Sequence, residues 1–594
     1  MQGKAELTPA GIQSRAELRR RRFGVLLACL GLYASLLLWL CFLLAGNGFE
    51  AARVGLVICL AVAAPWTVLG AVNAGLGFWL LRAPGEMLRR AAPFALAGSA
   101  GRLRTRSAVL MTIRNEDSAR AFARLRAVAA SLDAQPDAAA FDFFILSDSD
   151  DPAIAAAERL EFAHWLSCAR EPGRIHYRRR TENAGFKAGN IADFCARWGA
   201  GYEFMIPLDA DSLMDGATIV KLVRIGEAWP RLGLIQTLVV GAPSRSAFAR
   251  IFQFGMRAGM RAYTVGATWW AGDCAPFWGH NALVRVAPFA RHCQLPPLKG
   301  GAAILSHDQI EAALLRRAGY ETRMLPLESG SYEDNPPTLV DFVRREARWR
   351  RGNMQYVELL RLPGLAPMSR FHLLWAIGMY LRAPALAAAL LLAALMVSHG
   401  GADSVSVPAA AGFVSIFLFL NLLPKLAGYL DTALTPGAVA RQGGRLRFAA
   451  SVGVESLASL VIGAATGFDV AVRMIAAPLL GRVEWGAQAR DAHGVTVAAA
   501  LRLFAPQLAF GGLLFGLTAA GSWRLALWTL PLTAAYALAP LFAVASASPR
   551  VGRLFVTARL CASAEESAPP TVLRALSPPE EAAPAGALAP YLRR

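Results

Sequence analysis

Seven long apolar segments, in two groups, constrain this chain more than any other feature. A bilayer core about 30 Å thick is crossed by about 20 apolar helical residues, and each segment is long enough to cross it. Hydrophobic residues make up 55% of the chain and charged residues 17%, which argues against a wholly soluble enzyme, a fibrous protein and a disordered protein. The sequence therefore predicts an α-helical polytopic membrane protein. The segments are Phe23–Gly46, Val54–Leu81, Phe371–Val397, Ala409–Leu430, Phe448–Leu480, Val495–Ala520 and Leu525–Ala547.

Arginines flank the first two apolar segments on one side only. Arg19–Arg22 precede the first segment and Arg82, Arg89 and Arg90 follow the second, whereas the connecting loop holds only Arg53, opposed by Glu50. The positive-inside rule then places the N-terminus and the chain after the second segment in the cytoplasm. A cleavable signal peptide is the competing interpretation, but the first segment is too long and a second one follows at once. Membrane orientation thus explains much of the net charge of +19 better than a nucleic-acid partner does.

The segment Phe448–Leu480 has two interpretations. At 33 residues it is either one span with an interfacial extension or two short spans broken near Gly467–Asp469. Arginines 441, 445 and 447 precede it and arginines 482 and 490 follow it, so both flanks look cytoplasmic. We expect two crossings here, about eight spans in total, and both termini inside.

The region between residues 103 and 365 has no segment apolar and long enough to span, and short β-rich runs alternate there with amphipathic helical ones. Such alternation predicts a mostly parallel α/β sheet, in which ligands bind beyond the carboxyl ends of the strands. The expected strands are Ser107–Ile113, Phe141–Leu146, Phe204–Leu208 and Gly233–Val240, and the expected helices are Ala119–Leu132, Pro152–Ala169 and Ala188–Trp198.

Carboxylates follow two of these strands. Asp209 and Asp211 come at the end of Phe204–Leu208, and their i, i+2 spacing puts both side chains on one face of an extended segment. Oxygen ligands of this kind suit Mg²⁺ or Mn²⁺, which often bridge carboxylates to substrate phosphates. Asp148 follows the strand before it along the chain, whereas Asp150–Asp151 before Pro152 are expected to cap a helix.

Further polar motifs surround these carboxylates, and each has a bland alternative. Thr112, Asn115 and Glu116 lie at the end of the first strand. A basic, Gly-containing segment with Lys187 precedes a helix. It could bind a diphosphate or be a solvated turn. Asp308 could take a proton from an attacking hydroxyl or cap a helix. The remaining candidates are the aromatic run Trp278–Gly279–His280, which could stack on a sugar or sit in the core, and the cluster Arg345, Arg348 and Trp349, which could bind ligand or mark the membrane boundary.

In this order, these residues resemble the processive family 2 glycosyltransferases, which include bacterial cellulose synthase. The family pattern D, DxD, TED and QxxRW maps onto Asp148, Asp209 with Asp211, Asp308, and Arg345 with Arg348 and Trp349. Two departures, Ser-His-Asp for TED and Arg345 at the Gln position, are similar to the glucans biosynthesis glucosyltransferase H family, as are the Phe277–Ala282 and Lys187–Asn190 motifs. The resemblance implies a cytoplasmic GT-A type glycosyltransferase domain inserted between the two groups of spans.

The resemblance also implies a role for each residue. Asp308 is the expected general base, and Asp209 and Asp211 are the expected ligands of Mg²⁺ or Mn²⁺. Donor-binding residues are expected at Thr112, Asn115, Glu116, Asp148, Lys187, Asp209, Arg345 and Arg348, and acceptor-binding residues at Trp278, Gly279, His280 and Trp349. Trp485, Gln488 and Arg490 occupy the place of the cellulose synthase gating loop.

Charged residues inside the apolar segments are costly in hydrocarbon, so they line a sugar-chain channel or else snorkel to the interface. They are Arg382, Glu455, Asp469, Arg473 and Arg502. The expected domains are a basic N-terminus (1–22), two spans (23–81), the glycosyltransferase domain (82–370), about six spans with a cytoplasmic loop near 482–494 (371–548) and a tail (549–594), disordered from about 562.

The sequence therefore predicts a bacterial inner-membrane, processive, inverting enzyme. It would polymerise glucose from UDP-glucose into the β-glucan backbone, β-1,2-linked by the resemblance, of osmoregulated periplasmic glucans. The growing glucan chain would pass outward through the spans, which membrane lipid surrounds. Acyl carrier protein and periplasmic glucan-processing proteins are further partners that the family suggests. The alternatives are a synthase of a cellulose-like or β-1,3-glucan and, from another class, a nucleotide-binding transporter.

Overall fold

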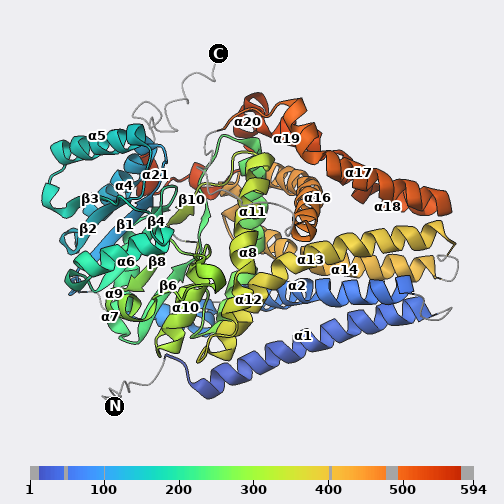
Figure 1. Cartoon of the computed structure of the whole chain (residues 1–594), viewed down its shortest axis with the longest axis horizontal. Helices are drawn as coiled ribbons and strands as arrows, with labels where there is room; N and C mark the ends of the chain where they lie inside the picture. Colours follow the sequence, from blue (N-terminus) through green and yellow to red (C-terminus); the bar gives the residue numbers. More distant parts are fainter. Residues whose placement is uncertain are drawn as a thin grey trace.

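The computed structural model describes residues 12–45, 51–83, 85–98, 101–328, 330–400, 405–476 and 492–576. These residues form an α/β domain, at the left of Figure 1, and an array of long helices that extends away from it. The strands are β1 (Ser107–Ile113), β2 (Phe141–Ser147), β3 (Ile175–Arg179), β4 (Phe204–Asp209), β5 (Leu213–Met214), β6 (Leu232–Thr237), β7 (Val240–Gly241), β8 (Ala282–Arg285), β9 (Glu321–Leu325) and β10 (Ser331–Glu333).

Seven strands form the main sheet, in the order β3-β2-β1-β4-β8-β6-β9, and β5-β10-β7 form a small second sheet. All neighbours in the main sheet are parallel except β8, which is antiparallel to β4 and to β6. The mostly parallel sheet is confirmed, as are the strands predicted at Ser107–Ile113, Phe141–Leu146 and Phe204–Leu208. The strand predicted at Gly233–Val240 is divided: β6 ends at Thr237, and Val240 belongs to β7 of the second sheet. The domain's helices are α3 (Met87–Ala91), α4 (Ser118–Asp133), α5 (Pro152–Cys168), α6 (Phe186–Trp198), α7 (Gly216–Ala228), α8 (Ala247–Ala271), α9 (Val286–His292), α10 (Asp308–Arg317), α11 (Leu339–Met354) and α12 (Tyr356–Leu359).

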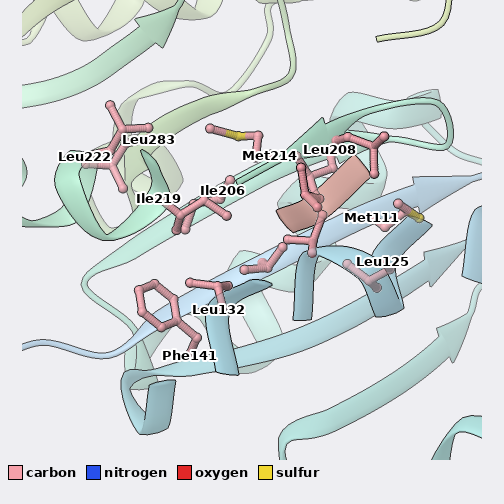
Figure 2. Close-up of a cluster of buried hydrophobic side chains, with 14 of the residues drawn as sticks. Met111, Leu125, Leu132, Phe141, Ile206, Leu208, Met214, Ile219, Leu222 and Leu283 are labelled. Atoms are coloured by element: carbon pink, nitrogen blue, oxygen red, sulfur yellow. The ribbon is translucent and has the colours of Figure 1, made fainter. Parts of the chain in front are cut away.

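Helices cover both faces of the main sheet because alternate strand residues point to opposite faces. In β1, Val109 and Met111 pack in the core beneath α4 and α7, which Figure 2 shows around Leu125 and Ile219. Leu110 belongs instead to the second core, formed with α6, α9 and α10. With both faces buried, the sheet leaves only its strand ends free to bind ligands.

The long helices carry the apolar segments. Among the residues that the structure describes, six of them are long and apolar enough to cross a membrane, and a pair bent by 46° gives a seventh candidate. The six are α1 (Arg15–Leu44), α2 (Ala51–Arg82), α13 (Pro367–Ser398), α14 (Val407–Leu434), α16 (Arg445–Ile475) and α17 (Val497–Gly521); the bent pair is α18 (Trp523–Ala537) and α19 (Ala539–Ala547). The short helices α15 (Ala438–Arg441), α20 (Pro549–Ala558) and α21 (Thr571–Arg574) complete the set.

The expected break near Gly467–Asp469 is absent, because α16 is one continuous helix through these residues. Asp469 pairs with Arg473 one turn further on, at 2.7 Å, and Glu455 pairs with Lys425 of α14. These carboxylates therefore have partners within the helix array and do not force the helix to end. The two crossings expected here correspond to a single helix over residues 445–475, so the described part of the chain holds at most seven candidate spans where eight were expected.

Helix α8 joins the domain to the long helices. It packs closely against α2, since a Cβ at Gly77 would lie 1.7 Å from the carbonyl oxygen of Ala262, and against α14, since a Cβ at Gly428 would lie 2.0 Å from that of Ala258. Only glycine fits at these two crossings. The domain is thus held to the helix array by backbone-to-backbone contact.

The tail differs from the disordered segment expected from about residue 562. Its described part runs through α21, and the Val572 side chain is fully buried in the core beneath α4. Arg257 of α8 donates two hydrogen bonds to Glu565, of 2.7 and 2.9 Å, and Arg250 contacts Glu566 at 3.1 Å. A composition rich in Pro, Ala and Glu did not indicate this packing, because the partners lie about 300 residues away in the sequence.

Candidate active site

The carboxyl ends of β2, β1 and β4 lie side by side, as the register requires. Ile113 of β1 pairs with Ser147 of β2, and Thr112 pairs with Asp209 of β4. Asp148 follows Ser147 directly. The polar residues singled out after three separate strands therefore meet at one edge of the sheet.

Asp148 is held by an arginine that sequence reasoning passed over. The Nε and Nη2 atoms of Arg180 each donate a 2.7 Å hydrogen bond to one carboxylate oxygen of Asp148. This bidentate geometry is strong and fixes the plane of the carboxylate. The run Arg178–Arg180 at the end of β3 was the available signal, but its sequence does not indicate which arginine turns inward.

Lys187 connects the acidic turn to the opposite wall of the site. It lies in the first turn of α6, where Gly185 has a φ of +71°. Its Nζ pairs with Oδ1 of Asp209 and donates a 2.8 Å hydrogen bond to the carbonyl oxygen of Gly279. A Cβ added at Gly279 would lie 3.4 Å from Cβ of Asp308 and 3.6 Å from Nζ of Lys187. The structure thus brings Lys187, Asp209, Gly279 and Asp308 together from four distant parts of the sequence.

Asp308 is the first residue of α10, and His307 before it occupies the capping position without a capping hydrogen bond. The helix-cap alternative for Asp308 is therefore wrong. His307 is buried, and its Nδ1 lies 2.9 Å from Oε2 of Glu311. Burial alone would lower the pKa of His307, but Glu311 and then Asp308 outweigh it and raise this pKa above its ordinary value. A hydrogen bond of 2.9 Å from the Tyr356 hydroxyl to the carbonyl oxygen of Ser306 holds the segment before Asp308.

The RxxRW residues lie on α11. The Arg345 guanidinium stacks over the Trp349 ring, 4.5 Å from its centroid, and Nε of this buried arginine has no hydrogen-bond partner within the described residues. Trp349 is 43% exposed, so its outer face is free to contact a ligand. Arg348 lies on the same helix between them, whereas Arg350 donates to the carbonyl oxygen of Arg473 in α16.

Glu333 at the end of β10 is the acidic residue that the sequence analysis missed. Its carboxylate faces Nε2 of His280 at 3.5 Å, and His280 in turn contacts Ser212 beside the acidic turn. Burial raises the pKa of Glu333, opposed by the charges of His280 and Arg345 and reinforced by those of Asp211 and Asp209. No motif surrounds Glu333, and only the long-range pairing of the small sheet places it here.

The loop after β1 forms hydrogen bonds that hold the loop after β2 in place. Asn115 has a φ of +50° and its Oδ1 accepts 3.2 Å hydrogen bonds from the backbone N–H groups of Asp150 and Asp151. Asp151 caps α5, as expected. Thr112 donates to the carbonyl oxygen of Leu208 at 3.3 Å, and Glu116 follows in the same loop.

Two other groups of predicted residues have no contact in the described part of the chain that tests their expected roles. Trp278 is half-buried, and its backbone N–H donates a 2.8 Å hydrogen bond to Oε1 of Gln236, which leaves its ring role a prediction. Trp485, Gln488 and Arg490, the expected gating loop, lie outside the described residues.

The carboxylate oxygens after β4 fit a hard divalent cation. Across the part of the chain that the structure describes, no three His, Cys, Asp or Glu side chains converge into a ready-made metal cage. Two carboxylates, Asp209 and Asp211, stand at the strand end instead. Mg²⁺ is usually bound in this way, by one or two carboxylates with substrate phosphates and water completing the set.

Comparisons with known proteins agree with the motifs. The family model "Glycosyl transferase family group 2" matches residues 204–419. The chain is 39% identical over 502 residues to a "Glucans biosynthesis glucosyltransferase H" of Caulobacter vibrioides, covering 80% of this chain and 74% of the relative. A protein of the same name from Xanthomonas oryzae is 38% identical over 493 residues, covering 79% and 76%.

Among solved structures, a mannosyltransferase from Pyrobaculum calidifontis with GDP-Man and Mn²⁺ aligns with a TM-score of 0.43 at 16% identity, covering 64% of this chain and 99% of that one. That similarity is too low to indicate anything about ligands here. The sequence relatives are much closer and match about three quarters of their own length. The chain therefore belongs to the glucans biosynthesis glucosyltransferase H family, a group of glycosyltransferases of family 2.

Proposed function

We propose that this protein polymerises glucose from UDP-glucose into a β-glucan, β-1,2-linked, by a processive inverting reaction on the cytoplasmic side of the bacterial inner membrane, and passes the chain outward. The observation that carries the proposal is the convergence of Lys187, Asp209, Gly279 and Asp308 at the carboxyl edge of the sheet. Two carboxylates and an ammonium group stand there together, and glycosyl transfer from a nucleotide sugar requires an acid–base group and a phosphate-binding group.

The donor would bind along the ends of β2 and β4. Asp148, its plane fixed by Arg180, would accept hydrogen bonds from the uracil ring, and Lys187 would move from Asp209 toward the diphosphate. Asp209 and Asp211 would hold Mg²⁺ or Mn²⁺, which when bound neutralises the charge that grows on the departing UDP. Arg345 and Arg348 supply further positive charge from α11.

Asp308 would act as the general base. An acceptor hydroxyl attacks the anomeric carbon of the α-linked glucose while its proton passes to the Asp308 carboxylate. The bond between that carbon and the UDP oxygen breaks, and UDP leaves with the electron pair. One displacement inverts the centre, so the new linkage is β. Trp349, with its exposed ring face, and Trp278 would hold the acceptor sugar by stacking.

The helix array supports the export part of the proposal. Its two carboxylates singled out from the sequence have partners: Glu455 pairs with Lys425 and Asp469 with Arg473, whereas Arg382 lies over the Trp66 ring and Arg502 is exposed. Such residues in membrane helices usually face the bundle interior, where a sugar chain would pass. Acyl carrier protein and the periplasmic glucan-processing proteins stay predictions that follow from the family.

The test uses the purified full chain in liposomes with radiolabelled UDP-glucose, with and without Mg²⁺ or Mn²⁺, followed by linkage analysis of the product. We expect cation-dependent β-1,2-glucan, lost at least about a hundredfold in Asp211→Ala and Asp308→Asn. Asp133→Asn, an exposed carboxylate at the end of α4, is the control and should retain activity.

Other outcomes separate the alternatives. A cellulose-like or β-1,3-linked product keeps the mechanism and overturns the proposed polymer. UDP binding without glucose incorporation, unchanged in Asp308→Asn, supports the transporter alternative and overturns the enzyme.

A further inference from the structure

Three side chains link β10 to the backbone of the acidic turn. Oε2 of Glu333 lies 3.5 Å from Nε2 of His280, and Nδ1 of the same ring lies 3.0 Å from Oγ of Ser212. Ser212 Oγ accepts a 3.1 Å hydrogen bond from the backbone N–H of Asp209. The path thus ends on the first of the two carboxylate residues that form the proposed cation site.

The direction of the protons along this path is determined by chemistry. When Glu333 is ionised its carboxylate only accepts, so it favours a His280 ring whose Nε2, 3.5 Å away, carries a proton. Ser212 already accepts the Asp209 N–H, and its single hydroxyl proton can then be donated to Nδ1 of a neutral ring. In a doubly protonated ring Nδ1 donates instead to Oδ1 of Asn281, 3.2 Å away. In both states Glu333 selects the orientation of the ring.

Glu333 is itself mounted rigidly. Its strand pairs with β5 at Met214 and with β7 at Val240, and Nδ2 of Asn281 donates to the carbonyl oxygens of both Leu213 and Tyr332. The small sheet, the His280 loop and the acidic turn are therefore one hydrogen-bonded unit. A carboxylate held in this way can determine where its neighbours lie.

We propose that Glu333 is a positioning residue that acts through His280 and Ser212 to fix the Asp209–Asp211 turn for cation binding. The inference rests on the proposed function of that turn. It gives His280 a different role from the acceptor contact expected from the sequence. Partners that orient ligand-bearing groups in this way typically contribute about tenfold to a hundredfold to metal affinity.

The test measures Mn²⁺ binding to the full chain in detergent. Electron paramagnetic resonance detects the bound Mn²⁺, with UDP present and absent. We expect Glu333→Ala to weaken Mn²⁺ binding about tenfold or more. Glu333→Gln keeps an oxygen that accepts from Nε2–H and should restore affinity to within about threefold. His280→Ala and Ser212→Ala interrupt the same path elsewhere, so the result does not depend on the folding of a single variant.

Two controls make the outcome specific. Glu321→Ala removes a different buried carboxylate, paired with Arg323 on β9, and should leave Mn²⁺ affinity unchanged. The double variant Glu333→Ala/His280→Ala should bind no more weakly than either single variant, because both act along one path.

The inference is overturned if Glu333→Gln loses as much affinity as Glu333→Ala, since the charge would then act on the cation directly. It is also overturned if the two single losses multiply in the double variant, or if none of the variants changes Mn²⁺ affinity. A wild-type chain that binds no Mn²⁺, with or without UDP, would instead overturn the cation site of the proposed function, and the inference with it.

Discussion

Among single residues, His307 shows a physical consequence of a departure from the processive glycosyltransferase pattern. It stands where that pattern has the glutamate of TED, so a titratable base replaces an acid directly beside the proposed catalytic Asp308. Glu311 lies 2.9 Å from its Nδ1 and favours the protonated ring, and the positive charge of Lys187 only partly opposes this effect. The folded protein therefore favours the protonated ring.

This preference predicts a pH dependence of stability. Because the pKa of His307 is raised on folding, its contribution is complete below the ordinary value and is lost as pH rises through the folded value. We expect the midpoint of thermal unfolding to fall across this range and the fall to be smaller in His307→Gln. Equal slopes for both proteins would contradict the assignment.

Some residues of the site could be predicted from the sequence immediately around them, and others could not. Asp148 and Asp209 were predicted because each directly follows an apolar strand, and parallel strands end at the same edge. Glu333 and Arg180 could not be predicted in this way. Glu333 reaches the site because Ser331 pairs with Met214 and Tyr332 with Val240, and the local pattern around residue 333 contains no trace of that pairing.

At the scale of elements, the segment after α20 is the least expected feature. It connects the helix array to the α/β domain: Glu565 pairs with Arg257 of α8, which also pairs with Glu328 at 2.7 Å. Burial would lower the pKa of Arg257, but Glu328 and Glu565 raise it. Charge pairing with a distant helix orders a segment whose composition is typical of disorder.

Glu565→Ala should therefore destabilise the protein. Removing one partner of a largely buried ion pair costs about 3 kcal/mol, reduced here because Glu328 still accompanies Arg257. We expect the unfolding midpoint to fall by several degrees in a thermal-shift assay. Glu171→Ala removes an exposed carboxylate that lies 3.3 Å from Arg174, a contact worth about 1 kcal/mol at most, and is the matched control. A fall no larger than that of the control would contradict the role of this contact.

For the whole molecule, α16 determines how many times the chain crosses the membrane. The arginines on both flanks of α16 predict that its two ends lie on the same side of the membrane. A single helix that does not cross the bilayer satisfies this prediction, as two crossings would. The carbonyl oxygen of Arg441, before α16, accepts from Ser567 of the tail at 2.6 Å. The carbonyl oxygen of Arg473, near the end of α16, accepts from Arg350 of α11. Figure 1 shows α16 running across the direction of α13 and α14.

We therefore expect both ends of α16 to be accessible from the cytoplasm. Single cysteines at Gln442 and at the exposed Ile475, in a background without the eight native cysteines, should react with a membrane-impermeant maleimide in inside-out vesicles and not in spheroplasts. A cysteine at His399, beyond the end of α13, is the matched control and should react only in spheroplasts, because one crossing separates it from the α/β domain. Labelling of the two α16 positions from opposite sides would make α16 a full span, since a helix of 31 residues is long enough to cross. The C-terminal helices α17 to α19 would then begin outside the cell membrane, and the tail that contacts α8 could not reach it.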